Sequence, residues 1–126
     1  MRILVADDDE SSIKLTVKQL REKGHQVLTA FNGKEALRLL ETQDFDMVLM
    51  DIMMPEMDGL EATRRIRDPA SSVRNHDVPV IAITACAMSG DEERCREAGI
   101  DAYVSKPVSI ASLFAVIEKN LERTAS

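Results

Sequence analysis

Short apolar runs alternate with longer amphipathic stretches along the whole chain. Each apolar run predicts a strand buried on both faces, because consecutive apolar residues leave no polar side to face water. In the stretches between the runs, apolar residues recur every three or four positions, which is typical of helices with one buried face. The predicted strands are 3–6, 26–30, 47–50, 79–83 and 101–105, and the predicted helices are 10–23, 34–42, 59–67, 89–98 and one that begins after Ser109.

The alternation of strands and helices defines the class of fold. Five strands that alternate with five helices at regular spacing predict an α/β domain, with a parallel sheet covered by helices on both faces. A length of 126 residues suits one domain, so residues 1–126 are expected to form a single unit.

Charge and composition exclude several classes of function. The formal net charge is -6 and the pI is about 4.9, which argues against a nucleic-acid surface on this domain. No apolar stretch approaches the roughly 20 residues of a membrane span, and we expect no membrane contact by this domain. Arg2 and the acidic run Asp7–Asp9 leave no long apolar segment between them, so no signal peptide is expected. Cys86 and Cys95 form no disulfide framework or metal motif, so both are expected to be reduced and buried in a cytoplasmic protein.

Polar residues that suit phosphoryl chemistry stand at the ends of four predicted strands. Asp7 and Asp8 follow the first strand, and Asp51 follows the third. Thr84 follows the fourth strand and Lys106 the fifth. In a doubly wound parallel sheet, these ends lie at one edge. Carboxylates suit Mg²⁺, whereas a hydroxyl and an ammonium suit the oxygens of a phosphoryl group. Asp51 is the candidate nucleophile, because an aspartate can form an acyl phosphate.

Several of the charged residues have simpler interpretations. One acid of the run Asp7–Asp9 is expected to cap the following helix, since acids suit a helix N-terminus. Arg64, Arg65 and Arg67 are expected to form a solvated helix face. His76 is expected to be an exposed loop residue between 68 and 77.

The ordered set of strand-end motifs resembles the receiver domain of two-component response regulators over essentially the whole chain. Among receivers, the sequences of these motifs are most similar to those of receivers of hybrid sensor histidine kinases. The resemblance implies a flavodoxin-like (βα)5 fold with the sheet order 2-1-3-4-5. It rests on Asp7-Asp8, on residues 50–64, on Thr84-Ala85, on residues 98–103 and on Lys106-Pro107.

The resemblance also implies a role for each acid. Asp51 would be the phosphoacceptor. Asp8, Asp51 and the backbone carbonyl of Met53 would ligate Mg²⁺ directly, and Asp7 would act through a water molecule. Met53 and Cys86 supply no carboxylate or amide to orient an attacking water, so intrinsic dephosphorylation is expected to be slow.

The resemblance assigns two further roles, which are binding of the phosphoryl group and a conformational switch. Thr84 and Lys106 would hold phosphoryl oxygens. Thr84 and Tyr103 would form the switch, in which the Thr84 hydroxyl moves inward and the Tyr103 ring follows. The Lys106-Pro107 bond is expected to be cis, because Lys106 has to turn into the acid site directly after a strand ends.

The implied partner is a histidine kinase or a histidine phosphotransfer domain. Neither His25 nor His76 lies in a helix suited to be the phosphodonor, so the donor belongs to another chain or domain. Self-association on phosphorylation stays open. Two alternatives are weaker: a Mg²⁺-dependent phosphatase would need an aspartate where Met53 stands, and an interaction module would not need the intact acid set. We therefore expect a phosphoacceptor switch rather than an enzyme.

Leu15 is a candidate docking residue on the first predicted helix. At 3.6 residues per turn, it lies roughly opposite the apolar stripe that contains Ile13 and Val17. A single exposed leucine is common on protein surfaces. Its helix begins beside the acid edge, however, and in the family a helical partner packs beside the first helix.

Overall fold

The structure, a computed structural model, describes residues 1–52, 54, 57–84, 89–105, 115–116 and 118–119. Its strands form one parallel five-stranded sheet in the order β2-β1-β3-β4-β5, which confirms the predicted fold class. The strands are β1 (Arg2–Ala6), β2 (Gln26–Ala30), β3 (Met47–Asp51), β4 (Val80–Thr84) and β5 (Ala102–Ser105), and the helices are α1 (Glu10–Glu22), α2 (Gly33–Thr42), α3 (Gly59–Arg67) and α4 (Ser89–Ala98).

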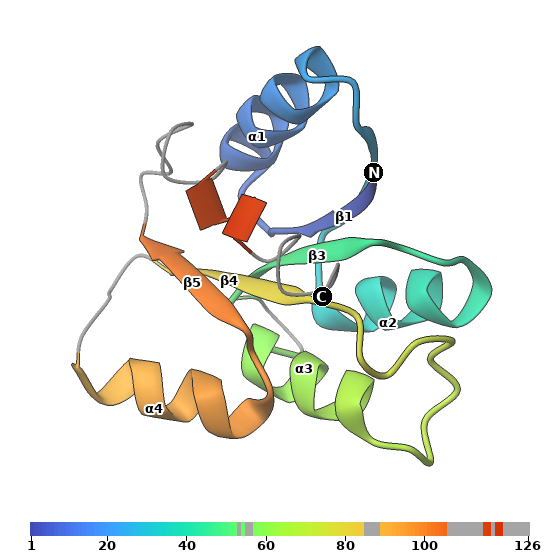
Figure 1. Ribbon diagram of the computed structural model, residues 1–126, viewed down its shortest axis with the longest axis vertical. Coiled ribbons are helices and arrows are strands. Elements are labelled where there is room, and N and C mark those ends of the chain that lie inside the picture. The colour runs from blue at the N-terminus through green and yellow to red at the C-terminus, as the bar shows by residue number, and fades with distance from the viewer. Residues whose placement is uncertain (53, 55–56, 85–88, 106–114, 117, 120–126) are drawn as a thin grey trace.

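Helices cover both faces of the sheet. α1 lies on one face, and α2, α3 and α4 lie on the other (Figure 1). Successive residues of a strand point to opposite faces, so β1 sends Ile3 and Val5 into the apolar cluster under α1, and Leu4 and Ala6 into the cluster under the other helices. β3 is buried at every position. Burial of each large aliphatic side chain stabilises the fold by about 1.5–3 kcal/mol.

The ends of the elements agree with the sequence prediction to within a residue or so. Asp9 caps α1, since its carboxylate accepts a hydrogen bond from the Ser11 N–H at 3.0 Å. α2 begins at Gly33, one residue before the predicted start, because Asn32 is its N-cap and accepts from the Glu35 N–H at 2.8 Å. Gly99 ends α4 with φ +100°, a left-handed conformation that favours glycine.

Arg67 is not part of a solvated face, which corrects the sequence prediction. Its side chain is 23% exposed, and its guanidinium donates to the carbonyl oxygens of His76, Val78 and Gly99 at 2.7–3.0 Å. It also forms an ion pair with Asp101 at 3.0 Å. One side chain thus joins the end of α3 to the segments before β4 and β5. Arg64 and Arg65 are solvent-exposed, as predicted.

The loop between α3 and β4 packs against the rest of the domain, although the sequence predicted a surface loop. His76 is half-buried, and its Nδ1 lies 2.9 Å from the carbonyl oxygen of Ile66. Val73 is buried in the apolar cluster of the α3 face. The prediction that His76 is simply exposed is therefore wrong, because the ring packs back onto the end of α3.

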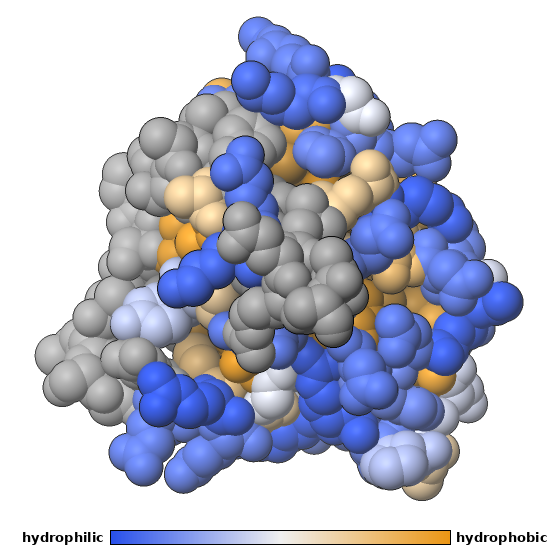
Figure 2. All heavy atoms as spheres, in the orientation of Figure 1, coloured by the Kyte–Doolittle hydropathy of each residue, from blue (hydrophilic) through white to orange (hydrophobic). Residues whose placement is uncertain are grey.

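Hydrophilic residues dominate the described part of the face shown in Figure 2, with small apolar patches between them. No helix among the described residues is long and apolar enough to cross a membrane. Of the last predicted helix, residues 115–116 and 118–119 are helical, and Val116 packs against the cluster under α1. Ser109 and Cys86 lie outside the described residues, whereas Cys95 is buried as predicted.

Candidate functional site

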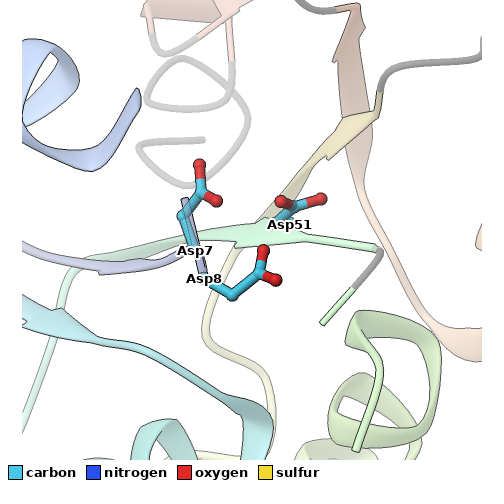
Figure 3. Close-up of side chains that lie close together, drawn as sticks. All are labelled: Asp7, Asp8 and Asp51. Atoms are coloured by element: carbon cyan, nitrogen blue, oxygen red, sulfur yellow. The ribbon is translucent and has the colours of Figure 1, made fainter. Parts of the chain in front are cut away.

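Three carboxylates meet at the carboxyl edge of the sheet. Asp7 and Asp8 directly follow β1, and Asp51 is the last residue of β3. β1 and β3 are neighbouring parallel strands with Ala6 opposite Met50, so the chain delivers Asp7 and Asp51 side by side. One oxygen from each of the three side chains lies within 4.8 Å of the others (Figure 3). The predicted acidic cluster is therefore present.

The three acids of the run Asp7–Asp9 have different environments. Asp7 is 2% exposed, its main-chain N–H donates to the Ala30 carbonyl at 3.0 Å, and its carboxylate accepts from the Asp9 N–H at 2.9 Å. Asp8 is exposed and faces the cluster. Asp9 turns away to cap α1. Two acids of the run are thus available to the site and the third serves the helix, as predicted.

The main chain around Asp51 is held from two sides. The Ile52 N–H donates to the carbonyl of Ile83 in β4 at 3.1 Å. The N–H of Gly59, the first residue of α3, donates to the Ile52 carbonyl at 2.8 Å. A Cβ on Gly59 would meet the Asp51 carbonyl oxygen and would lie 2.9 Å from the Ile52 Cα. α3 can therefore begin directly against the main chain of Asp51 only because residue 59 is glycine.

The donor set fits a small hard cation. Asp51 is 3% exposed and Asp7 is 2% exposed, so two carboxylates are concentrated in a poorly solvated place. Neighbouring carboxylates repel one another, and a bound cation relieves that repulsion. The cluster contains oxygen ligands alone, and Mg²⁺ binds through one or two carboxylates with waters filling its remaining positions.

The other predicted site residues are placed in part. The backbone of Thr84 ends β4 opposite Ser105 of β5, on the same edge as the acids. Lys106, Pro107 and Met53 lie outside the described residues, and so do the predicted cis bond and the predicted backbone ligand. The roles assigned to all these residues stay predictions.

Tyr103 lies in β5 and is 37% exposed. Its side chain borders a hollow of about 260 Å³ between α4 and β5, which Cys95 and Arg96 also line.

Neither histidine belongs to the acidic cluster. His25 precedes β2, at the amino end of the strands, where burial and then the nearby Met1 ammonium lower its pKa from the usual value. His76 contacts the end of α3.

Sequence reasoning missed two residues that shape the site and its supports. α3 begins at Gly59 as predicted, and Asp58 caps it by accepting from the Glu61 N–H at 2.8 Å. The contact of Gly59 with Asp51 was not foreseen. Arg67 was interpreted as solvated. The available signal was periodicity, because at 3.6 residues per turn Arg67 lies on the side of α3 that carries the buried Leu60 and Thr63.

A sheet of order 2-1-3-4-5 with three acids at its carboxyl edge is the arrangement of a receiver. The family model for the response regulator receiver domain matches residues 3–118. The chain belongs to this family, and it is a receiver domain of two-component signal transduction.

Similar proteins include response regulators and a domain of a sensor histidine kinase. The polar-differentiation response regulator DivK of Brucella anthropi is 40% identical over 119 residues, which cover 94% of each chain. The structure of the receiver domain of Francisella response regulator 1452 shares 32% identity and a TM-score of 0.87 over 98% of each chain. The receiver domain of the sensor histidine kinase PA1611 from Pseudomonas aeruginosa PAO1, with a magnesium ion coordinated in its active-site cleft, shares 36% identity and a TM-score of 0.83 over 94% of each chain.

Proposed function

We propose that this receiver domain accepts a phosphoryl group on Asp51, with Mg²⁺ bound by the acidic cluster, and that the donor is a phosphohistidine of a partner. The observation that carries the proposal is the position of Asp51: a carboxylate 3% exposed, at the end of a buried strand, grouped with Asp7 and Asp8 within 4.8 Å. Magnesium in the related receiver of PA1611 supports the choice of metal.

The proposed transfer is a displacement at phosphorus. An oxygen of the Asp51 carboxylate attacks, the phosphorus–nitrogen bond to the histidine breaks, and an acyl phosphate forms as the ring nitrogen leaves with the electron pair. Bound Mg²⁺ neutralises negative charge on the phosphoryl oxygens. The contribution of the chain is orientation, because β3 and the first turn of α3 hold the main chain of Asp51 before the donor arrives.

The ligands proposed for the metal are the Asp8 and Asp51 carboxylates and the Met53 carbonyl, with Asp7 acting through water. Thr84 and Lys106 are proposed to hold the phosphoryl oxygens. The position of Thr84 at the end of β4 supports this role, since the carboxyl ends of neighbouring strands share the edge that carries Asp51.

The domain is proposed to act as a switch rather than as an enzyme with an external substrate. The proposed partner is a histidine kinase or a histidine phosphotransfer domain, because neither histidine of the chain lies beside Asp51 among the described residues. Kinases draw the phosphoryl group from ATP, so the proposed place of action is the cytoplasm. Contact with nucleic acid is not proposed for a domain of net charge -6.

Phosphorylation by a small phosphodonor tests the assignment. The protein is incubated with acetyl phosphate and Mg²⁺, and intact mass is measured. The expected result is an adduct of one phosphoryl group per chain, absent in Asp51→Asn and absent in EDTA. The matched control is Asp77→Asn, an exposed loop aspartate, which should be phosphorylated like the wild type. An adduct that persists in Asp51→Asn would falsify the assignment.

A further inference from the structure

A groove of about 630 Å³ runs along α1 beside the edge strand β2, outside the acidic site. Ile13 and Val17 of α1 line it, together with Thr29 of β2 and the following Phe31. Ile13 and Val17 are buried, whereas Phe31 is 46% exposed. The groove therefore offers an aliphatic base with one half-exposed aromatic ring, in a chain that has only three phenylalanines.

The charged residues that line the groove have a defined order along α1. Lys14, Lys18 and Arg21 lie between Glu10 and Glu22, the first and last residues of the helix. At 3.6 residues per turn, the three cations fall within roughly 60° of arc and form one stripe. A basic stripe stands out on a protein of net charge -6. The ion pair of Lys14 with Glu10, at 3.5 Å, has both side chains 74% exposed, and such pairs contribute little and break readily.

Side chains from the neighbouring helices cover the open edge of β2. The Arg21 guanidinium donates to the Val27 carbonyl at 3.2 Å, and the Glu35 carboxylate accepts from the Phe31 N–H at 3.3 Å. Side chains that cover an edge disfavour the addition of another strand. A segment that enters this groove is therefore expected to lie on the side chains as a helix, rather than to extend the sheet.

The groove and Leu15 lie on different flanks of α1. The basic stripe is centred roughly 100° from the core stripe, and Leu15 lies roughly a further 100° around the helix. Leu15 is 55% exposed and is absent from the groove lining. A phosphodonor that packs on Leu15 would leave the groove accessible.

We propose that the α1–β2 groove is a docking site for an acidic amphipathic helix of a partner protein other than the phosphodonor. An apolar residue of that helix packs against Phe31, and its carboxylates face Lys14, Lys18 and Arg21. The partner helix carries its acids in the middle, where they face the three cations of α1. It carries none at its ends, where they would face Glu10 and Glu22. Helix-in-groove recognition of this kind needs one apolar stripe with charges beside it.

Two designed peptides test the groove directly. Both are about 18 residues long, which is enough for helix formation, and share one leucine stripe. The first carries three glutamates beside the middle of the stripe, and the second carries lysines there. Each is titrated into the isotope-labelled protein, and amide chemical shifts are followed by NMR.

The acidic peptide should give saturable shifts at Lys14, Lys18, Thr29 and Phe31, and the lysine peptide should not. Lys18→Glu and Phe31→Ser should each weaken binding by about tenfold or more. Arg38→Glu, an exposed cation of α2, is the matched control and should bind like the wild type. The double variant Lys14→Glu, Lys18→Glu should bind the lysine peptide instead.

A photo-crosslinking residue in cells tests whether such a partner exists. Phe31 is replaced by p-benzoylphenylalanine, and Leu28 is replaced in the matched control, since Leu28 is 37% exposed on β2, the strand that precedes Phe31, and does not line the groove. The expected result is a crosslink specific to position 31, to a segment that mass spectrometry identifies as an acidic amphipathic helix.

Several results would overturn the proposal. In the titrations, these are equal binding of both peptides and shifts that map to the Leu15 flank. Groove shifts that depend on protein concentration without peptide would indicate a second copy of the chain instead. In cells, the lack of a crosslink specific to position 31 would also contradict the proposal. Phosphorylation of the Phe31 and Lys18 variants by acetyl phosphate is measured separately. Both variants should be phosphorylated like the wild type, because Phe31 and Lys18 lie outside the acidic cluster, so failure of the groove proposal leaves the phosphoacceptor assignment unaffected.

Discussion

Gly59 packs against the main chain of Asp51 with no room between them for a side chain. Its N–H bonds the Ile52 carbonyl at 2.8 Å, and a Cβ in its place would collide with the Asp51 carbonyl oxygen. The residue proposed to receive the phosphoryl group is thus positioned by a glycine of the next helix.

Gly59→Ala should displace α3 or Asp51 and so affect both stability and metal binding. Because backbone atoms meet the new methyl group, the expected loss of unfolding free energy is about 1–3 kcal/mol, and Mg²⁺ affinity should fall with it. Chemical denaturation and Mg²⁺ titration measure the two effects. Gly24→Ala is the control: at φ +89° it costs backbone strain, but nothing lies within 4 Å of its Cβ, so Mg²⁺ affinity should not change. Equal Mg²⁺ affinity in Gly59→Ala would show that the contact does not position Asp51.

Substitutions of Asp8 and Asp9 should have different effects on stability and on the response to Mg²⁺, although the two residues are adjacent in the chain. Mg²⁺ at 100 times its dissociation constant should raise the unfolding free energy of the wild type by about 2.7 kcal/mol. Asp8→Asn should abolish most of this gain, because Asp8 belongs to the cluster. Asp9→Ala should lower stability by about 1 kcal/mol through loss of the α1 cap while keeping the gain from Mg²⁺. Thermal unfolding with and without Mg²⁺ distinguishes them, and identical responses of the two variants would contradict the assignment.

Arg67→Met should be strongly destabilising, because three main-chain carbonyls and the Asp101 carboxylate lose their donor. Hydrogen bonds to charged groups contribute about 1.5–3 kcal/mol each, and they share one side chain here, so the expected loss is about 2–4 kcal/mol. Arg65→Met, which removes an exposed pair with Glu61, should change stability by less than about 0.5 kcal/mol. Similar urea midpoints for the two variants would count against the role given to Arg67.

Tyr103 should move when the site carries a phosphoryl mimic. It is the single tyrosine of a chain without tryptophan, so intrinsic fluorescence reports on this ring alone. With beryllofluoride and Mg²⁺ bound, the ring should turn inward and acrylamide quenching should fall, because the proposed contact of Thr84 with the mimic differs between the two states. Asp51→Asn is the control and should show no change. Unaltered quenching in the wild type with bound beryllofluoride would rule out this route of switching.

Leu15→Ala should slow phosphotransfer from a histidine donor without affecting the fold. Leu15 is 55% exposed, so stability should stay within about 0.5 kcal/mol of the wild type. Phosphorylation by acetyl phosphate should be unchanged, because the residue lies outside the acidic cluster. Rates of transfer from a phosphorylated histidine kinase or phosphotransfer domain measure the effect. A slower reaction with acetyl phosphate, or a lower melting temperature, would place Leu15 in the core instead.

The sequence by itself determined the order of elements and the residues at the strand ends. Apolar runs such as 47–50 and helical stripes such as Ile13 with Val17 are local patterns, and each tells which face of its own element is buried. Once the sheet is parallel, the acids that follow β1 and β3 lie at one edge, and the sheet order implied by the family resemblance makes these strands neighbours. The acidic cluster was therefore predictable from the sequence.

Only the tertiary structure decided what the same residues contact across the chain. Arg67 bonds the carbonyl of Gly99, 32 residues away, and helix periodicity can place Arg67 on the inner side of α3 but cannot name that partner. The contact of Gly59 with Asp51 and the groove between α1 and Phe31 likewise depend on how closely two elements approach. Periodicity shows that a face is buried, but the distance to its neighbour is set by the packing of every side chain between them.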